Sequence, residues 1–240
     1  MHNAILAVTI LFASLFSAGC APLPPKHEVA YSVPCSVGTE TRSKYEYQHV
    51  PPKVDTQGQA PASPAPGEML VGYENEWQQS GIGGVNYRYL GIAYRGFVFF
   101  DRNSLPAKGL VLEAKLTFKT PSTVTWQGDS ASNETASAAA RFYALTAPAS
   151  GYYSTGDLLV DLPSHPGTTT NAVFDSSAGL VINVTTIIRD IVNGTRPNHG
   201  FMLVGANESF QHNNNKFLST YAAPTLQVRV LEDVPQWPTP

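Results

Sequence analysis

The alternation of apolar and polar positions is clearest around residues 95–120. From Leu110 the side chains alternate, which is the two-residue period of a strand with one face in the core and one in solvent. The predicted core face carries Leu110, Leu112, Ala114, Leu116 and Phe118. Val111 falls on the other face, together with Glu113 and Lys115. The run Phe97–Phe100 is apolar without a break, and this predicts a strand covered on both faces.

Further strands are predicted by similar short apolar runs. They are expected at residues 69–73, 87–90, 141–145, 158–162, 172–174, 180–184, 201–205 and 225–230. In the last of these, Leu226, Val228 and Val230 are expected to point inward. Residues 78–86 are predicted to form a glycine-rich loop, and residues 121–138 a long polar loop or hairpin.

One helix is predicted, from Thr185 to Asn193. Ile187, Ile188 and Ile191 share one of its faces, and Thr185 or its neighbour Thr186 can cap the free amides at its start. Gly194 can adopt the left-handed conformation that ends a helix. We expect this short helix to lie across one end of the β-structure.

Together these elements predict an all-β fold. The expected architecture is an antiparallel two-sheet sandwich of jelly-roll type over residues 68–232, with one short helix. The 19 glycines and 19 prolines agree with this class because they favour turns over long helices. A domain of this length buries well over half of its unfolded surface, so it needs no disulfide.

Residues 1–19 are predicted to be a lipoprotein-type signal peptide. The apolar run Ala4–Phe16 is too short to span a bilayer comfortably and has the length of a signal-peptide core. The following Ser17–Cys20 resembles the lipobox of bacterial lipoproteins, in which the cysteine is lipidated and becomes the mature N-terminus. This resemblance implies an envelope protein held at the membrane, most simply the outer membrane, through a lipid on Cys20. The alternative is an ordinary secretory signal cut near Ala18 or Ala21, which gives a secreted protein.

Residues 20–67 are predicted to be a Pro-rich tether, and residues 233–240 a Pro-rich tail. The tether would hold the domain several tens of ångströms from the membrane. Within it, residues 29–50 form either a short strand that docks on the domain or a plain linker. If Cys20 carries lipid, Cys35 is a single thiol; if it does not, the two cysteines can pair and close a short loop.

The charge pattern argues against a nucleic-acid partner. The formal net charge is -3, and no window of the chain gathers lysines and arginines into a basic patch.

The chain also lacks the strong catalytic signatures, namely HExxH, GxSxG, a phosphate-binding loop and paired CxxC. A hydrolase with paired carboxylates stays open, because two such groups need to be close only in space. Its candidate residues are Asp101, Asp157, Asp161 and Asp175, although a carboxylate that follows a strand is usually a turn or cap residue. No cofactor is predicted. Oxygen ligands in the loop expected around Glu74–Glu76 suit a structural Ca²⁺, and the favoured alternative is that these acids are simply solvated.

The candidate ligand-binding residues are aromatic side chains outside the alternating pattern. They are Trp77, Tyr87, Trp126, Tyr152 and Tyr153. An exposed flat ring offers a stacking surface for a sugar, whereas the alternative role for each ring is to plug an end of the sandwich.

Two stretches resemble a known family, the DNRLRE-type domains of secreted bacterial proteins. The first runs from Tyr94 to Asp101 and on through Asn103–Pro106; the second comprises Ile182–Thr185, Asn198–Leu203 and Pro224–Val228. The resemblance implies a jelly-roll sandwich and, as in some relatives, non-catalytic binding of acidic or other polysaccharides.

We therefore expect a lipid-anchored envelope protein whose sandwich binds a glycan or surface polymer. The alternatives are a structural lipoprotein that binds a protein partner, and a hydrolase or lyase that acts on polysaccharides.

Overall fold

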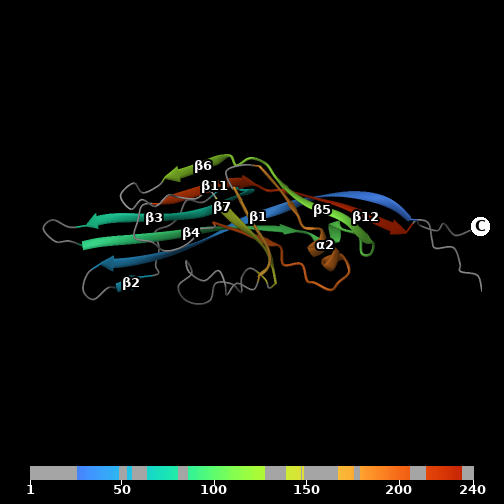
Figure 1. The fold of residues 1–240 in the computed structure, drawn as a ribbon, viewed down its shortest axis with the longest axis horizontal. Coiled ribbons are helices and arrows are strands. Elements are labelled where there is room, and N and C mark those ends of the chain that lie inside the picture. The colour runs from blue at the N-terminus through green and yellow to red at the C-terminus, as the bar shows by residue number, and fades with distance from the viewer. Residues whose placement is uncertain are drawn as a thin grey trace, which may run out of the picture.

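The computed structural model describes residues 26–48, 53–55, 64–80, 86–127, 139–146, 148, 167–175, 179–205 and 215–233. At several strand ends, residues 42–48, 77–80, 86–90 and 126–127 among them, the description is limited to the backbone. The described chain forms antiparallel strands and one α-helix (Figure 1). The predicted all-β antiparallel sandwich class with one short helix is confirmed.

The elements follow one another along the chain with these bounds. They are β1 (Lys26–Gln48), β2 (Lys53–Asp55), β3 (Glu68–Ser80), β4 (Asn86–Phe100), the 3₁₀ turn η1 (Arg102–Ser104), β5 (Leu110–Phe118), β6 (Thr123–Gln127), β7 (Ala139–Leu145), β8 (Gly167–Asp175), β9 (Leu180–Asn183), the helix α2 (Thr185–Val192), β10 (Phe201–Gly205), β11 (Lys216–Ala222) and β12 (Thr225–Asp233). The predicted loop at residues 78–86 is thus shortened by the ends of β3 and β4, and the predicted loop at residues 121–138 contains β6. The strand predicted at residues 158–162 lies outside the described residues.

Strand β1 belongs to two sheets. Its first part, Lys26–Pro34, pairs with β12, and its second part, Cys35–Gln48, pairs with β4. The first sheet has the strand order β1–β12–β5–β9. The second has the order β1–β4–β3–β11–β6, and β10 and β7 continue it from the end of β4. Because β1 is shared, the two sheets form one continuous hydrogen-bonded path.

The segment expected to be a tether therefore contains the first strand of the fold. Of the two alternatives left open for residues 29–50, the structure has the strand, which links the two sheets by pairing with β12 along its first part and with β4 along its second. The folded unit thus includes residues 26–48 as well as the expected 68–232. Only residues 21–25 separate Cys20 from β1, which corresponds to about 20 Å of fully extended chain rather than several tens of ångströms.

The main core lies between the two sheets. The first sheet contributes Leu116, Leu226 and Val228, and the second contributes Phe142 and Phe201. All five side chains are at most 1% exposed. The rings of Phe142 and Phe201 stack at a centroid distance of 5.0 Å. The prediction that alternate residues of β12 point inward is confirmed.

A β-bulge changes the predicted faces at the start of β5. Val111, expected to face solvent, is fully buried, whereas Leu110, expected in the core, is 49% exposed. Val230 of β12 lies opposite Val111, and the preceding residue of β12 lies opposite Glu113, so Leu112 is the extra residue. An extra residue exchanges the two faces of a strand beyond it. The predicted alternation is therefore right after the bulge and wrong before it.

Helix α2 packs on the core beside β5, and its predicted apolar face is confirmed. Ile187, Ile188 and Ile191 are all buried. Gly194 follows the helix with a φ of 74°, in the left-handed region predicted for the helix stop. At the C-terminal end, Arg102 Nη2 donates a hydrogen bond of 3.3 Å to the Val192 carbonyl.

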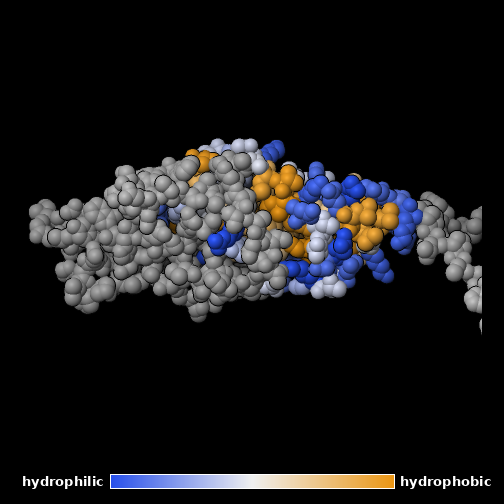
Figure 2. All heavy atoms as spheres, viewed as in Figure 1, coloured by the Kyte–Doolittle hydropathy of each residue, from blue (hydrophilic) through white to orange (hydrophobic). Residues whose placement is uncertain are grey.

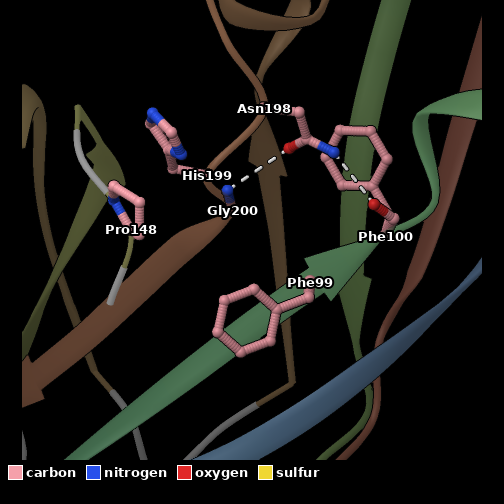
Figure 3. A pocket seen from close by; sticks show the side chains of 6 residues that line it. All are labelled: Phe99, Phe100, Pro148, Asn198, His199 and Gly200. Atoms are coloured by element: carbon pink, nitrogen blue, oxygen red, sulfur yellow. Dashed lines mark hydrogen bonds between the residues drawn. The ribbon is translucent and has the colours of Figure 1, made fainter. Parts of the chain in front are cut away.

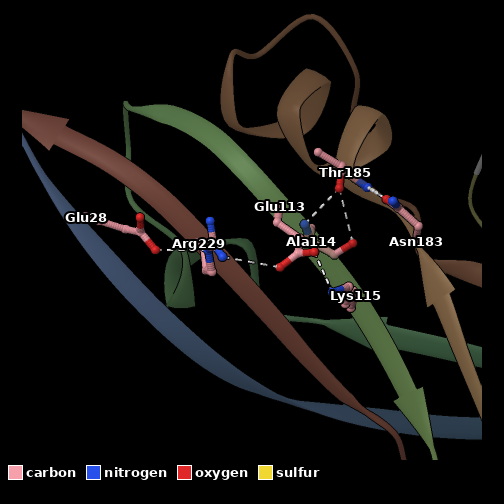
Figure 4. Close-up of polar contacts among 7 residues, drawn as sticks. All are labelled: Glu28, Glu113, Ala114, Lys115, Asn183, Thr185 and Arg229. Atoms are coloured by element: carbon pink, nitrogen blue, oxygen red, sulfur yellow. Dashed lines mark hydrogen bonds and ion pairs between the residues drawn. The ribbon is translucent and has the colours of Figure 1, made fainter.

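The start of α2 differs from the prediction. The N-cap residue is Val184, whose side chain cannot cap, and Asn183 Oδ1 accepts a hydrogen bond of 3.0 Å from the Thr185 amide. The hydroxyl of Thr185 instead contacts the backbone of Ala114 in β5. Thr185 Oγ1 accepts a hydrogen bond of 2.9 Å from the Ala114 amide and donates one of 3.4 Å to its carbonyl (Figure 4). Because β9 ends at Asn183, the Thr185 hydroxyl satisfies the Ala114 amide, while the Ala114 carbonyl also accepts a hydrogen bond of 2.9 Å from the Val184 amide.

Candidate ligand-binding site

The side chains predicted to bind a ligand are outside the described part of the molecule. The backbones of Trp77 and Tyr87 lie in the paired strands β3 and β4, where Trp77 is opposite Tyr89. The backbone of Trp126 lies in β6, opposite Phe217 of β11, so it is separated from β3 by one strand. Cys20, Tyr152 and Tyr153 lie outside the described residues altogether. The predicted set of binding residues therefore stays a prediction.

The structure presents a different feature, a pocket of about 230 Å³ at the end of β4. It is lined by Phe99, Phe100, Pro148, Asn198, His199 and Gly200. Figure 3 shows Phe99 on one side, His199 and Pro148 across from it, and Gly200 between them. Three segments far apart in the sequence thus meet here: the end of β4, the chain after β7 and the chain before β10.

Phe99 differs from the other residues of its apolar run. Phe97, Val98 and Phe100 are buried, as the prediction of a doubly covered strand requires, whereas Phe99 is only partly buried. Its ring lies parallel to that of Phe97, at a centroid distance of 6.1 Å and an interplanar angle of 5°. Phe97 belongs to a second apolar cluster, together with Tyr143 and Met202. Phe99 therefore packs against the edge of this cluster, and the part of its ring that stays exposed lines the pocket.

Gly200 allows the Phe99 ring to lie close to the backbone of the facing chain. Its φ is 85°, a conformation that side chains other than glycine rarely adopt. A Cβ atom at this position would lie 2.4 Å from the Val98 carbonyl oxygen and 2.8 Å from Cδ1 of Phe99. Any side chain here would displace the ring, so glycine is required for the shape of the pocket.

Asn198 ties the chain before β10 to β4. Its Nδ2 donates a hydrogen bond of 2.9 Å to the Phe100 carbonyl, and its Oδ1 accepts one of 3.3 Å from the Gly200 amide (Figure 3). On the other side, the Leu145 amide of β7 donates a hydrogen bond of 3.0 Å to the Gly200 carbonyl. These bonds hold the pocket wall on both sides. A carboxamide has two donor hydrogens and two acceptor lone pairs, so Asn198 keeps capacity for a ligand.

His199 is the second polar side chain of the pocket, and unlike Asn198 it does not hold the pocket wall through hydrogen bonds to other described residues. It is partly buried, and within the described part of the chain it has no hydrogen-bond or ion-pair partner. A neutral imidazole carries one donor and one acceptor nitrogen, and both are free to contact a bound molecule. This pocket is a candidate site because it is lined both by a partly exposed aromatic ring and by an imidazole that has no partner among the described residues.

Sequence reasoning missed Phe99 and His199 as site residues. The stretch Asn198–Leu203 carried the family resemblance but had no assigned role, and Phe99 was placed in a doubly covered strand. A usable signal was present, since the Asn-His-Gly sequence puts two polar side chains and a glycine directly before a buried strand.

Carboxylates on the first sheet serve strand pairing. On its solvent face, Arg229 pairs with Glu28 at 2.9 Å and with Glu113 at 3.8 Å, and Lys115 also pairs with Glu113 (Figure 4). The hydrogen bond from Lys115 holds the pKa of Glu113 below its usual value. Exposed pairs of this kind contribute little to stability because water and salt screen them. In Figure 2 the end of the molecule that carries β5 and β12, on the right, has a largely hydrophilic surface interrupted by apolar areas.

The other predicted carboxylates do not assemble into a site among the described side chains. Asp101 is the N-cap of η1, because its side chain accepts a hydrogen bond of 2.9 Å from the Asn103 amide. This agrees with the cap role weighed for it. Asp175 is described only by its backbone, in β8, and Asp157 and Asp161 lie outside the described residues.

The segment expected to hold a structural Ca²⁺ is a strand and not a loop. Glu74–Glu76 lies inside β3, where neighbouring side chains point to opposite faces. Glu74 pairs with Lys216 at 2.7 Å. Among the side chains that are described, no group of three or more His, Cys, Asp or Glu residues is arranged to hold a metal ion.

Cys35 carries a free thiol in β1. Burial raises its pKa to about 11, and the Val33 carbonyl lies 3.9 Å from its sulfur. A thiol with such a pKa is a poor nucleophile near neutral pH because little of it is ionised. This agrees with a structural rather than a catalytic role for Cys35.

Comparison of the chain with protein-family models, with curated proteins and with solved structures found no match. The similarity to DNRLRE-type domains therefore rests on the sequence motifs alone. In the part of the chain that is described, no helix is long and apolar enough to cross a membrane.

Proposed function

We propose that this protein is a lipid-anchored protein of the cell envelope whose β-sandwich binds a glycan without turning it over. The observation that carries the proposal is the Phe99 pocket, which is lined both by a partly exposed aromatic ring and by the imidazole of His199, a group without a partner among the described residues. Sugars have apolar faces that pack on aromatic rings and hydroxyl groups that exchange hydrogen bonds. The pocket offers both kinds of contact within one small space.

Binding is favoured over turnover by the chemistry of the pocket wall. Glycoside hydrolysis generally needs two carboxyl groups on either side of the bond that breaks. The six described residues that line the pocket include no carboxylate. Asp101, the nearest in sequence, is engaged as the cap of η1.

The proposed anchor is a lipid on Cys20. Its support is the lipobox-like Ser17–Cys20 and the short distance in sequence between Cys20 and Lys26, where β1 begins. Lys26 lies opposite Asp233, so the first and last strands share one end of the molecule, and β3 and β4 meet at the other (Figure 1). A lipid on Cys20 would hold the β1–β12 end within about 20 Å of the membrane and direct the β3–β4 end outward.

The glycan proposal is tested by incubating the full chain, purified in mild detergent, with an array of bacterial and plant polysaccharides. We expect selective retention on one or a few polymers. Retention on none, together with recovery of one stable envelope protein by crosslinking in cells, would replace the proposal with the alternative of a structural lipoprotein.

The anchor proposal needs a separate experiment. Metabolic labelling with a palmitate analogue and mass spectrometry of the mature N-terminus should find lipid on Cys20, and the Cys20→Ser variant should leave the membrane fraction. A wild-type N-terminus without lipid would support the secreted alternative instead.

A further inference from the structure

We infer that the Phe99 pocket takes a single uncharged sugar ring, namely the terminal unit of a neutral glycan. This inference rests on the proposed glycan-binding function and adds to it the charge of the ligand and the part of the chain that is recognised. Three properties of the pocket lead to it: its size, its fixed wall and the absence of lysine, arginine and carboxylate side chains among its described lining residues.

The size limits the ligand to one ring. Pockets for drug-sized ligands measure about 300–1,000 Å³. The Phe99 pocket, at about 230 Å³, is smaller than this range. A chain end, which offers one ring, fits this geometry.

The wall of the pocket is held in place before any ligand binds. Asn198 is bonded to the backbone of Phe100 and Gly200, and Gly200 is bonded in turn to Leu145 of β7. Gly200 also lets the Phe99 ring lie against the backbone, where a Cβ atom would push it away. A pocket that is already shaped loses little entropy when it binds, which lets a ligand as small as one sugar be retained.

The lining favours an uncharged ligand. It consists of two phenyl rings, a proline, an imidazole, a carboxamide and a glycine, with neither a lysine, an arginine nor a carboxylate among the described lining residues. Placing a carboxylate there would cost free energy because no lysine or arginine among the described lining residues compensates its charge. The net charge of -3 adds a weak repulsion of polyanions. Hydroxyl groups, in contrast, suit the donors and acceptors of His199 and Asn198.

The test is an NMR titration of the full chain in detergent micelles with two sets of monosaccharides. The neutral set is glucose, galactose, mannose and N-acetylglucosamine, and the charged set is glucuronic and galacturonic acid. We expect at least one neutral sugar to shift the ring resonances of His199 and Phe99, and the uronic acids to leave them unchanged. The same neutral sugar should compete with the polysaccharide that the array retains.

Variants assign the effect to the pocket. Phe99→Leu, which keeps apolar volume but removes the flat ring, and His199→Ala should each weaken binding of the sugar at least tenfold. Val181→Ala, an exposed apolar position in β9 of the other sheet, should bind like the wild type. Circular dichroism and thermal melting check that each variant is folded, and His199→Ala keeps the test informative if Phe99→Leu is not.

The outcomes separate the two proposals. If the array retains a polysaccharide but no monosaccharide shifts the pocket resonances, the pocket inference fails and the glycan-binding function stands. If only uronic acids bind, the inferred neutrality of the ligand is overturned. If no glycan of any kind binds, both proposals fail.

Discussion

The side chain of Arg189 in α2 donates two hydrogen bonds to the backbone carbonyl of Val111 in β5, with distances of 3.3 Å from Nε and 3.0 Å from Nη2. Val111 directly precedes Leu112, the extra residue of the bulge. The helix therefore does more than cover the core. By holding this carbonyl it helps to fix which residues at the start of β5 face inward.

Replacing Arg189 with lysine should destabilise the protein. Lysine keeps the charge but lacks the planar fork that places two donors on one carbonyl. We expect the free energy of unfolding to fall by about 1–3 kcal/mol, the usual range for a lost hydrogen bond to a charged group in a partly buried site. Urea denaturation measures this. The control is Arg229→Lys, whose half-exposed side chain should matter by less than about 1 kcal/mol. Equal stability of both variants would contradict the structural role of Arg189.

Replacing Thr185 with valine should weaken the junction between α2 and β5. Valine has the same shape, but it leaves the Ala114 amide without the 2.9 Å hydrogen bond from its backbone N–H to the hydroxyl. We expect a loss of about 1–3 kcal/mol and faster hydrogen exchange of the Ala114 amide. Thr185→Ser retains the hydroxyl and should exchange nearly as slowly as the wild type. Unchanged exchange in the valine variant would show that the hydroxyl does not protect this amide.

Tyr31 should make stability depend on pH in the alkaline range. Its hydroxyl donates a hydrogen bond to Glu232, and this bond, with burial and the nearby negative charge, raises its pKa to about 12. The folded state thus holds a proton that the unfolded state releases near pH 10. The stabilisation is fully present below about pH 10 and is lost as the pH rises towards 12. In unfolding experiments between pH 9 and 11.5, Tyr31→Phe should show a shallower decline than the wild type; identical slopes would refute the coupling.

Cys35 should react slowly with thiol reagents. In a Cys20→Ser chain it is the remaining cysteine, and its pKa of about 11 leaves little thiolate at pH 8. We expect Ellman's reagent to modify the folded chain far more slowly than the urea-unfolded chain. Equal rates would mean that the thiol is neither buried nor shifted in pKa.

Local patterns predicted the fold class because burial on one face imposes a period that a single strand displays by itself. Leu116 and Val228 illustrate this, and the apolar face of α2 does so with a different period. The bulge at Leu112 could not be predicted, because it is a property of the pairing between β5 and β12 and not of either strand alone.

For related reasons the sequence could not decide between a strand and a linker for β1, and it did not show the pocket. In β1 only Val33 is fully buried among the described side chains, so its sequence resembles a polar, proline-containing linker. Its place in the fold comes from backbone pairing with strands far away in the chain. The pocket joins Phe99, Pro148 and His199 from three separate segments, and the sequence does not show that they meet.

The pairing of β1 with β12 also sets the order in which this protein can fold. Val29 lies opposite Val230, about 200 residues later in the chain. Contacts between such distant residues require closure of a long loop and are typical of slow folding. A nascent chain that has been synthesised only as far as residue 224 has no partner for the first part of β1. The sandwich can be completed only after residues 225–233 have been synthesised, so the polypeptide remains unfolded, or partly folded, until β12 has been made.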